Sequence, residues 1–212
     1  MEYRLLRADG EWRWINDRGT PFFDESGAFA GYIGSCMDVT DKVEGLAYKE
    51  ISQKDGLTGI LSRQYLLNQL QRFFDIARTN GLQLTIALMD IDKFKKINDR
   101  FGHLIGDSAL KLFASVVKDK IRSEDLFGRY GGDEFLIVFR NTTANTAHEV
   151  IARIDDSLKT VVLKAGQDEI ALTMSAGVAS LSAETAFDEL INLADQRMYL
   201  QKRDKKLVAD VD

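Results

Sequence analysis

Two carboxylates directly follow two glycines in the segment Gly131-Gly132-Asp133-Glu134, and an apolar run over residues 135–139 comes next. A glycine removes its side chain from the path of a ligand, so that a bulky group can approach the backbone. Adjacent carboxylates attract positive charge. We therefore expect a ligand with a cation at this turn, while the alternative is a charged hairpin tip without a chemical role.

A second acidic pair, Asp90 and Asp92, ends the apolar segment 82–89. Carboxylates in this position emerge at a sheet edge, where ligands of open α/β sheets collect. If the two segments are neighbouring strands, Asp90 converges with Asp133, and the two carboxylates repel unless a proton or a metal lies between them. Oxygen ligands with space for water and phosphate predict Mg²⁺, or Mn²⁺, at this edge.

Polar residues that could recognise a base lie in segment 94–107, where Asn98, His103 and Asp107 bracket Gly102 between two helical stretches. A carboxylate can accept from both N1–H and the exocyclic amine of guanine, a donor pair that adenine lacks. Taken singly, Asn98 could instead end one helix, and Asp107 could cap the start of the next.

The elements that must position these residues alternate between helix and strand from about residue 55 onward. Apolar periodicity predicts helices over 66–77, 105–120, 144–158 and 186–203, and strands over 82–89, 127–130, 135–139 and 170–179. The two middle strands form a hairpin around the acidic turn. This order predicts an α/β layered (α+β) fold with a partly antiparallel sheet and helices flanking it.

The first forty residues follow a different pattern, with three antiparallel strands predicted over 3–7, 12–16 and 29–37. So small a sheet is a poor domain on its own. A helix should begin within residues 38–42, with Thr40 as its N-cap. Its apolar stripe predicts either an ordinary amphipathic helix or a dimer-forming stalk, and the stripe consists of Val43, Leu46, Ala47 and Ile51.

Composition excludes several classes of protein. Lys and Arg number 28 against 33 Asp and Glu, and a net charge of −5 argues against binding of a nucleic acid polymer. A single cysteine excludes an intrachain disulfide, and with only two histidines beside it we expect no structural zinc site. The sequence contains no apolar run of the roughly 20 residues that cross a membrane. Its start lacks the apolar core of a signal peptide, so we expect a cytoplasmic protein without a membrane segment.

Residues 55–206 resemble the GGDEF-family diguanylate cyclases, and residues 1–40 resemble the C-terminal part of a PAS sensor domain. The first resemblance rests on five segments in the family's order, DGLTGILSR, MDIDKFKKINDRFGHLIGD, RSEDLFGRYGGDEF, SAGVA and ADQRMYLQK. The second rests on RADGEWRWI, DESGAFAGYIG and MDVTDK. Together they imply a partial PAS sheet over 1–40, a signalling linker helix over 41–54 and a GGDEF domain with a nucleotidyl-cyclase-like mixed sheet over 55–212. They also imply a piece of a longer protein.

The family joins two GTP molecules into cyclic di-GMP and releases two pyrophosphates. Each subunit binds one GTP, so a homodimer is implied. By resemblance, Asp90, the Ile91 carbonyl and Asp133 hold divalent metal, while Glu134 either binds metal or activates the 3′-hydroxyl. Guanine would be read by Asn98 and Asp107 with His103 beside them, and phosphates would be neutralised by Lys95, Lys202 and Lys206.

An Arg-x-x-Asp pair precedes the acidic turn, formed by Arg122 and Asp125. Such a pair is often a solvated surface ion pair. Its spacing resembles the family's inhibitory site, where cyclic di-GMP binds away from the catalytic cleft. Arg153 aligns with a second arginine of that site. The resemblance therefore implies feedback inhibition by the product.

This sequence departs from the family at three positions. Lys206 stands in place of the usual Arg, Lys205 in place of the usual Gly, and Ser62 in place of the usual Asn. The retained Asp55 and Arg63 are expected to pair. The alternatives to an active cyclase are a non-catalytic receptor for GTP or cyclic di-GMP and a cyclase of another nucleotide specificity. Retention of all three acids, Asp90, Asp133 and Glu134, disfavours the receptor.

Overall fold

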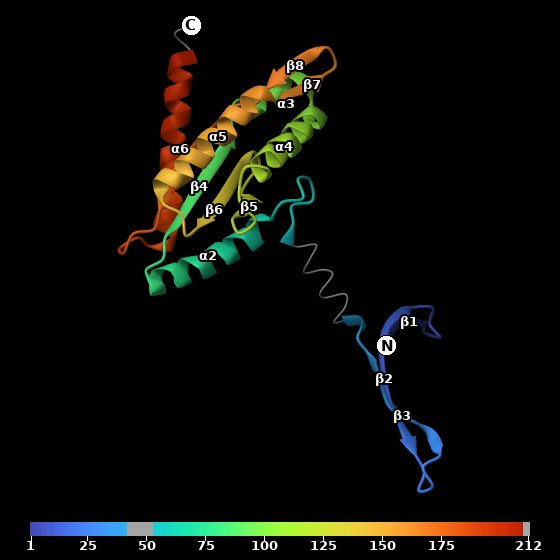
Figure 1. Cartoon of the computed structure of the whole chain (residues 1–212). Coiled ribbons are helices and arrows are strands. Elements are labelled where there is room, and N and C mark those ends of the chain that lie inside the picture. Colours follow the sequence, from blue (N-terminus) through green and yellow to red (C-terminus); the bar gives the residue numbers. More distant parts are fainter. Residues whose placement is uncertain (42–52, 210–212) are drawn as a thin grey trace. The chain divides into compact units, whose positions relative to one another are not determined.

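The computed structural model describes residues 1–41 and 53–209 (Figure 1). The chain divides into two compact units, Met1–Ser52 and Gln53–Asp212. The predicted apolar stripe of Val43, Leu46, Ala47 and Ile51 lies outside the described residues.

The first unit is an antiparallel sheet in the order β1-β2-β3, as the sequence predicts. Its strands are Glu2–Leu6, Trp12–Phe23 and Phe29–Asp38. Strand β2 is longer than expected because Phe22 and Phe23 continue its pairing with β3. The expectation that Thr40 is an N-cap is wrong, since Thr40 is already helical and its backbone N–H donates to the Asp38 carboxylate at 2.9 Å. The Thr40 hydroxyl accepts from the Trp14 amide instead.

The second unit is built on a four-stranded sheet in the order β5-β6-β4-β9, in which every neighbouring pair is antiparallel. The strands are β5 (Leu126–Arg129), β6 (Glu134–Arg140), β4 (Leu84–Ile91) and β9 (Met174–Ser180). The helices are α2 (Arg63–Asn80), α3 (Phe94–Phe101), α4 (His103–Lys118), α5 (Ala144–Thr160) and α6 (Phe187–Ala209). This mixed α+β arrangement confirms the predicted fold class.

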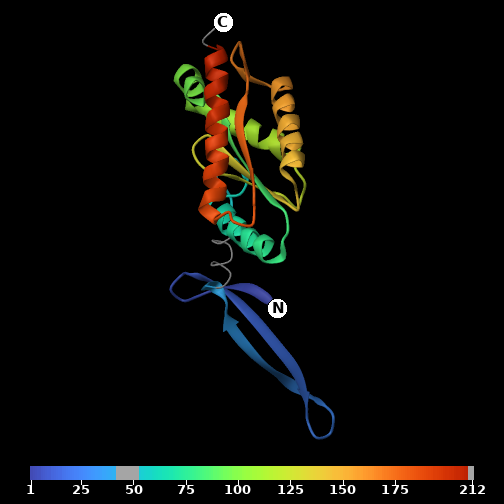
Figure 2. The same ribbon diagram turned by 90° about the vertical axis from the view of Figure 1, so that its left-hand side faces the viewer.

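Helices cover both faces of this sheet, so all eight residues of β4 are buried. Successive side chains of β4 pack on opposite faces of the sheet. Ala87, Met89 and Ile91 join a core with α4 and α5, whereas Ile86 and Leu88 join a core with α2 and α6. Figure 2 shows α5 and α6 on opposite sides of the sheet. The buried strand therefore fixes the position of the acidic residues at its end.

The predicted strand over 170–179 is divided in the structure. Its first part belongs to a small hairpin of β7 (Val162–Ala165) and β8 (Asp168–Ala171), which turns at Gly166 with a φ of 66°. The carbonyl of Thr173, between β8 and β9, accepts from the backbone N–H of Asp92. The sequence pattern did not indicate this break, because both parts are extended.

Candidate active site

The two acidic segments meet across one pair of strands. Asp90, near the end of β4, lies opposite Glu134, the first residue of β6. The backbone N–H of Ile91 donates to the Asp133 carbonyl at 3.3 Å, so the turn stays against the end of β4. The convergence predicted from the sequence is present, and it results from antiparallel pairing.

The carboxylates of this cluster are buried to different degrees. Asp90 is only 5% exposed, and its Oδ1 accepts from Lys202 Nζ on α6 at 2.7 Å. Burial raises the pKa of Asp90, and the charges of Asp133 and Glu134 raise it further against the opposing effect of Lys202. Burial likewise raises the pKa of Glu134, followed by repulsion from Asp133 and Asp195. Negative charge is therefore concentrated here beyond what one lysine neutralises.

Carboxylates of the same cluster also shift the pKa of Lys202. Burial acts to lower its pKa, but the hydrogen bond and charge of Asp90, with the charges of Asp133 and Asp92, outweigh that effect and raise it. Lys202 is thus held in its charged form beside the acids. A cation placed among carboxylates in this way can also face the phosphates of a ligand.

The tight turn that presents Asp133 is held from both ends. The carbonyl of Glu134 accepts from the N–H groups of Tyr130 and Gly131, and a Cβ on Gly131 would lie 2.6 Å from Glu134 Oε2. Gly131 therefore leaves room for the Glu134 carboxylate itself. A Cβ on Gly132 would meet nothing within 4 Å, which leaves that side of the turn open.

Arg129 is a residue of this turn that the sequence did not single out. Its guanidinium donates to the Gly132 carbonyl at 3.0 and 2.7 Å and pairs with Asp55 at 3.4 Å. The expected pairing of Asp55 with Arg63 is wrong, because Arg63 lies over the Tyr130 ring instead, 4.7 Å from its centroid. Only the fold could reveal this exchange of partners, since either arginine satisfies the carboxylate chemically.

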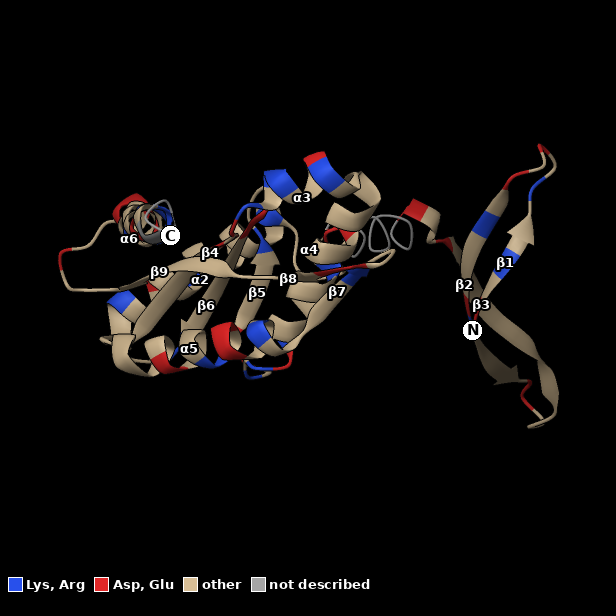
Figure 3. Cartoon of the chain, turned by 90° about the horizontal axis from the view of Figure 1, so that it is seen from above, with Lys and Arg blue, Asp and Glu red and all other residues tan. Residues whose placement is uncertain are grey.

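Next to the acids lies a pocket of about 390 Å³ rich in lysine, lined by Lys202 and Lys206 of α6 and by Lys93 and Lys96. Figure 3 shows basic residues on α3, the helix that begins directly after Lys93. Lys93 adopts a left-handed backbone with a φ of 56°, which is uncommon for a residue with a side chain. The predicted Lys95 is exposed on the same helix. The pocket can accept a multiply charged anion beside the carboxylates.

The predicted base-recognition residues flank the turn between α3 and α4. Asn98 lies within α3 and Asp107 within α4, so neither is the helix cap that we considered as an alternative. A Cβ on Gly106 would lie 1.9 Å from Asn98 Oδ1, so this glycine allows the Asn98 amide to lie against α4. His103 is exposed on the first turn of α4. Asn98 and Asp107 are both half-buried.

Arg122 and Asp125 line a separate pocket of about 540 Å³. The backbone N–H of Arg122 donates to the side-chain Oδ2 of Asp125 at 3.1 Å. Asp125 Oδ1 is buried. Burial raises the pKa of Asp125, Glu124 adds to the rise, and Arg122 opposes it. Arg153 is exposed on α5 and does not line this pocket.

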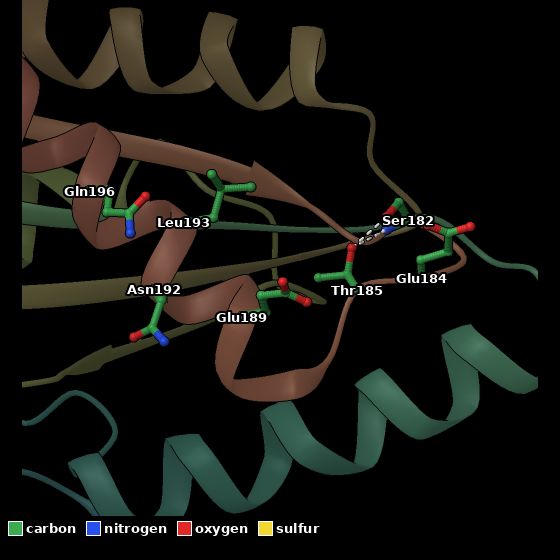
Figure 4. Close-up of a pocket in the computed structure, with 7 residues that line it drawn as sticks. All are labelled: Ser182, Glu184, Thr185, Glu189, Asn192, Leu193 and Gln196. Carbon is green, nitrogen blue, oxygen red and sulfur yellow. Dashed lines mark hydrogen bonds between the residues drawn. The ribbon is translucent and has the colours of Figure 1, made fainter.

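A further pocket of about 460 Å³ lies between the end of β9 and the first turns of α6 (Figure 4). Its polar groups serve the local chain: the Ser182 N–H donates to the Thr185 hydroxyl, and Glu189 accepts from the Ala186 N–H. It contains none of the acids or lysines described above, so we do not assign the chemistry to it.

The donor set at the strand ends is compatible with a hard divalent cation. Among residues 1–41 and 53–209, no three His, Cys, Asp or Glu side chains gather closely enough to coordinate a metal by themselves. Mg²⁺ usually takes one or two protein carboxylates and completes its shell with water and substrate phosphates. Two converging carboxylates beside an anion-binding pocket match this mode of Mg²⁺ coordination better than a site in which every ligand comes from the protein.

Within the described part of the chain, none of the helices has both the length and the apolar character needed to cross a membrane.

Comparison with known proteins identifies relatives of both units. The family profile described as diguanylate cyclase, GGDEF domain, matches residues 52–207, and the profile of the PAS fold matches residues 1–36. The diguanylate cyclase DosC of Escherichia coli K12 is 36% identical over 164 residues, covering 74% of this chain and 35% of the relative. The chain thus spans about a third of the length of this curated relative.

Two solved structures share the fold of the second unit. One is diguanylate cyclase SiaD of Pseudomonas aeruginosa in complex with its activator SiaC, with 33% identity, a TM-score of 0.71, and coverage of 77% of this chain and 63% of that one. The other is the coiled coil and GGDEF domain of DgcB from Caulobacter crescentus in complex with c-di-GMP. It has 28% identity and a TM-score of 0.72, over 78% of this chain and 91% of that one.

Proposed function

The chain belongs to the GGDEF family of diguanylate cyclases, and we propose that it condenses two GTP molecules into cyclic di-GMP with release of two pyrophosphates. The observation that carries this proposal is the pairing of Asp90 with Glu134 beside Lys202 and the lysine pocket. We further propose that residues 1–40 are part of a PAS sensor, residues 41–54 a signalling linker and residues 55–212 the catalytic domain.

Each residue of this site is assigned a role in phosphoryl-type transfer. Asp90, the Ile91 carbonyl and Asp133 would hold Mg²⁺ or Mn²⁺, which when bound polarises the α-phosphate and offsets the charge of the reacting oxygens. Glu134 takes either of two roles, as a further metal ligand or as the base for the attacking 3′-hydroxyl. Lys202, Lys206 and Lys95 neutralise phosphate charge and keep the nucleotide in place.

Guanine recognition is assigned to Asp107 and Asn98, with His103 nearby. Replacing Asp107 with alanine removes the acceptor for guanine N1–H and its amine. We expect the KM for GTP to rise by the equivalent of about 1–3 kcal/mol, and the preference for GTP over ATP to fall. Competition between the two nucleotides measures this, with Asp99→Ala, an exposed acid on α3, as the matched control. Unchanged discrimination in Asp107→Ala would place guanine recognition elsewhere.

The proposed reaction needs two GTP-loaded subunits, because one domain supplies one nucleotide. Incubation with GTP and Mg²⁺ followed by chromatography of the products tests the activity. A rise in specific activity with protein concentration tests the homodimer. A specific activity that does not change with concentration, in a protein shown to be monomeric, would contradict the two-subunit arrangement.

We also propose feedback inhibition at the pocket of Arg122 and Asp125, with Arg153 contributing from a neighbouring domain. The planar guanidinium of Arg122 suits a phosphate or the guanine edge, and the Asp125 carboxylate, which also lines this pocket, is an acceptor of the kind that guanine N1–H and its amine require. We expect Arg122→Ala to weaken inhibition by cyclic di-GMP about tenfold or more, which corresponds to one lost charged hydrogen bond, while the initial rate stays near wild type. Progress curves with added product decide this, with Arg78→Ala on α2 as control. Equal inhibition of Arg122→Ala and wild type would mean that Arg122 and Asp125 are a surface pair that does not bind the product.

A further inference from the structure

Lys205, which stands where the family usually has glycine, makes contacts of its own in the lysine pocket. Its Nζ donates to Asp92 Oδ2 at 3.2 Å and also to the Met174 carbonyl. The other oxygen of Asp92 accepts from the Ser175 hydroxyl at 2.6 Å, and the Asp92 side chain is only 11% exposed. Both oxygens of this carboxylate are therefore occupied, one of them by a cation.

Asp92 is the one acidic residue among the described residues that line this pocket. The other charged residues that line the pocket are lysines, and Lys93, Lys96 and Lys206 make no ion pair or hydrogen bond through their ammonium groups within residues 1–41 and 53–209. A pocket with three uncommitted ammonium groups is suited to a polyphosphate. A bare carboxylate in its wall would repel the same ligand.

We propose that Lys205 is a positioning residue that screens Asp92 from the substrate's polyphosphate, so that the remaining lysines of the pocket act on the phosphates without opposition. This rests on the proposed function, since it deepens the role of the same site. Lys205 acts through Asp92 and is not assigned a contact with the reacting atoms. Its effect should therefore fall on KM for GTP, which reports binding, more than on kcat.

The competing explanation is mechanical. Lys205 joins α6 to β9 through Met174, and loss of that tether could displace Lys202 and Lys206. The two explanations differ in what a change at Asp92 does. Removing the charge of Asp92 relieves an electrostatic defect in a Lys205 variant, but it cannot restore a lost tether.

The experiment is a double-mutant cycle on the full chain with Lys205→Met, Lys205→Arg, Asp92→Asn and the double variant Asp92→Asn/Lys205→Met. We expect Lys205→Met to raise the KM for GTP about tenfold. The KM of Lys205→Arg should stay much closer to that of the wild type, because arginine retains the charge. In the Asp92→Asn background, Lys205→Met should change KM less than about twofold. An equal rise in KM in both backgrounds would overturn screening in favour of the tether.

Calorimetric titration with inorganic tripolyphosphate separates this proposal from the proposed function, because it needs no turnover. The wild type should bind tripolyphosphate, Lys205→Met should bind it about tenfold more weakly, and the double variant should match Asp92→Asn. This pattern supports screening even if no cyclic di-GMP is formed. Undiminished binding by Lys205→Met, or no binding by the wild type, would overturn the proposal.

Discussion

Replacing Glu134 with glutamine should reduce cyclic di-GMP formation at least about a hundredfold, the lower range of what an acid–base residue contributes. Glu134 lies opposite Asp90 and is one of the acids that concentrate negative charge at the strand ends. Glutamine keeps the size of the side chain but removes the charge that a metal or a 3′-hydroxyl would require. The loss is expected under either of the two roles proposed for Glu134.

The fold should survive this change. Burial and the neighbouring acids raise the pKa of Glu134, which means that its ionised form is disfavoured in the folded state. At neutral pH a neutral side chain should therefore leave the free energy of unfolding equal or slightly higher. Turnover and urea denaturation of Glu134→Gln, with Glu149→Gln on the exposed face of α5 as control, measure both effects. A Glu134→Gln protein that retains most of its turnover would remove this residue from the chemistry.

Replacing Gly177 with alanine should lower the free energy of unfolding by about 3 kcal/mol, the upper range for inserting a methyl group into a packed core. A Cβ at Gly177 would lie 1.9 Å from the Ala194 carbonyl oxygen and 2.4 Å from the Met198 nitrogen. Both atoms belong to the backbone of α6, so the helix itself must move. Because Lys202 follows one turn later and bonds Asp90, turnover should fall as well.

The matched control is Gly56→Ala. A Cβ there would meet nothing within 4 Å, and the backbone of Gly56 is not left-handed, so its stability should be unchanged or slightly higher. The midpoint of urea unfolding measures both variants. If Gly177→Ala unfolds at the wild-type midpoint, the close approach of α6 to β9 would be wrong.

Hydrophobic periodicity was sufficient for the main helices and strands, because each buries one stripe or both faces against a single sheet. Helix α2 is the clearest case, since Leu66, Leu70, Phe74 and Ala77 are all buried and Gly81 ends the helix with a φ of 65°. The β7–β8 hairpin escaped prediction because its strands are short and only partly buried. Thr40 was misassigned because Asp38, two residues earlier, offers an equally good cap.

The convergence of the acidic residues could be predicted from the sequence, because carboxylates at the adjoining ends of neighbouring strands lie close together. The lysine contacts did not follow, because they depend on where α6 crosses the sheet. Lys202 contacts Asp90 near the end of β4, and Lys205 contacts Asp92 just after β4, each more than a hundred positions earlier in the chain. Arg129 was missed for a related reason, since its two partners come from different segments that only the fold brings together.

The most direct test of the central proposal is to incubate the full chain with GTP and Mg²⁺ and to quantify nucleotide products and pyrophosphate in the same samples. We predict that cyclic di-GMP appears, that two GTP are consumed for each molecule formed, and that two pyrophosphates accompany it. GTP that stays intact over the full range of protein concentration, or that is converted to GDP and phosphate, would contradict the assignment.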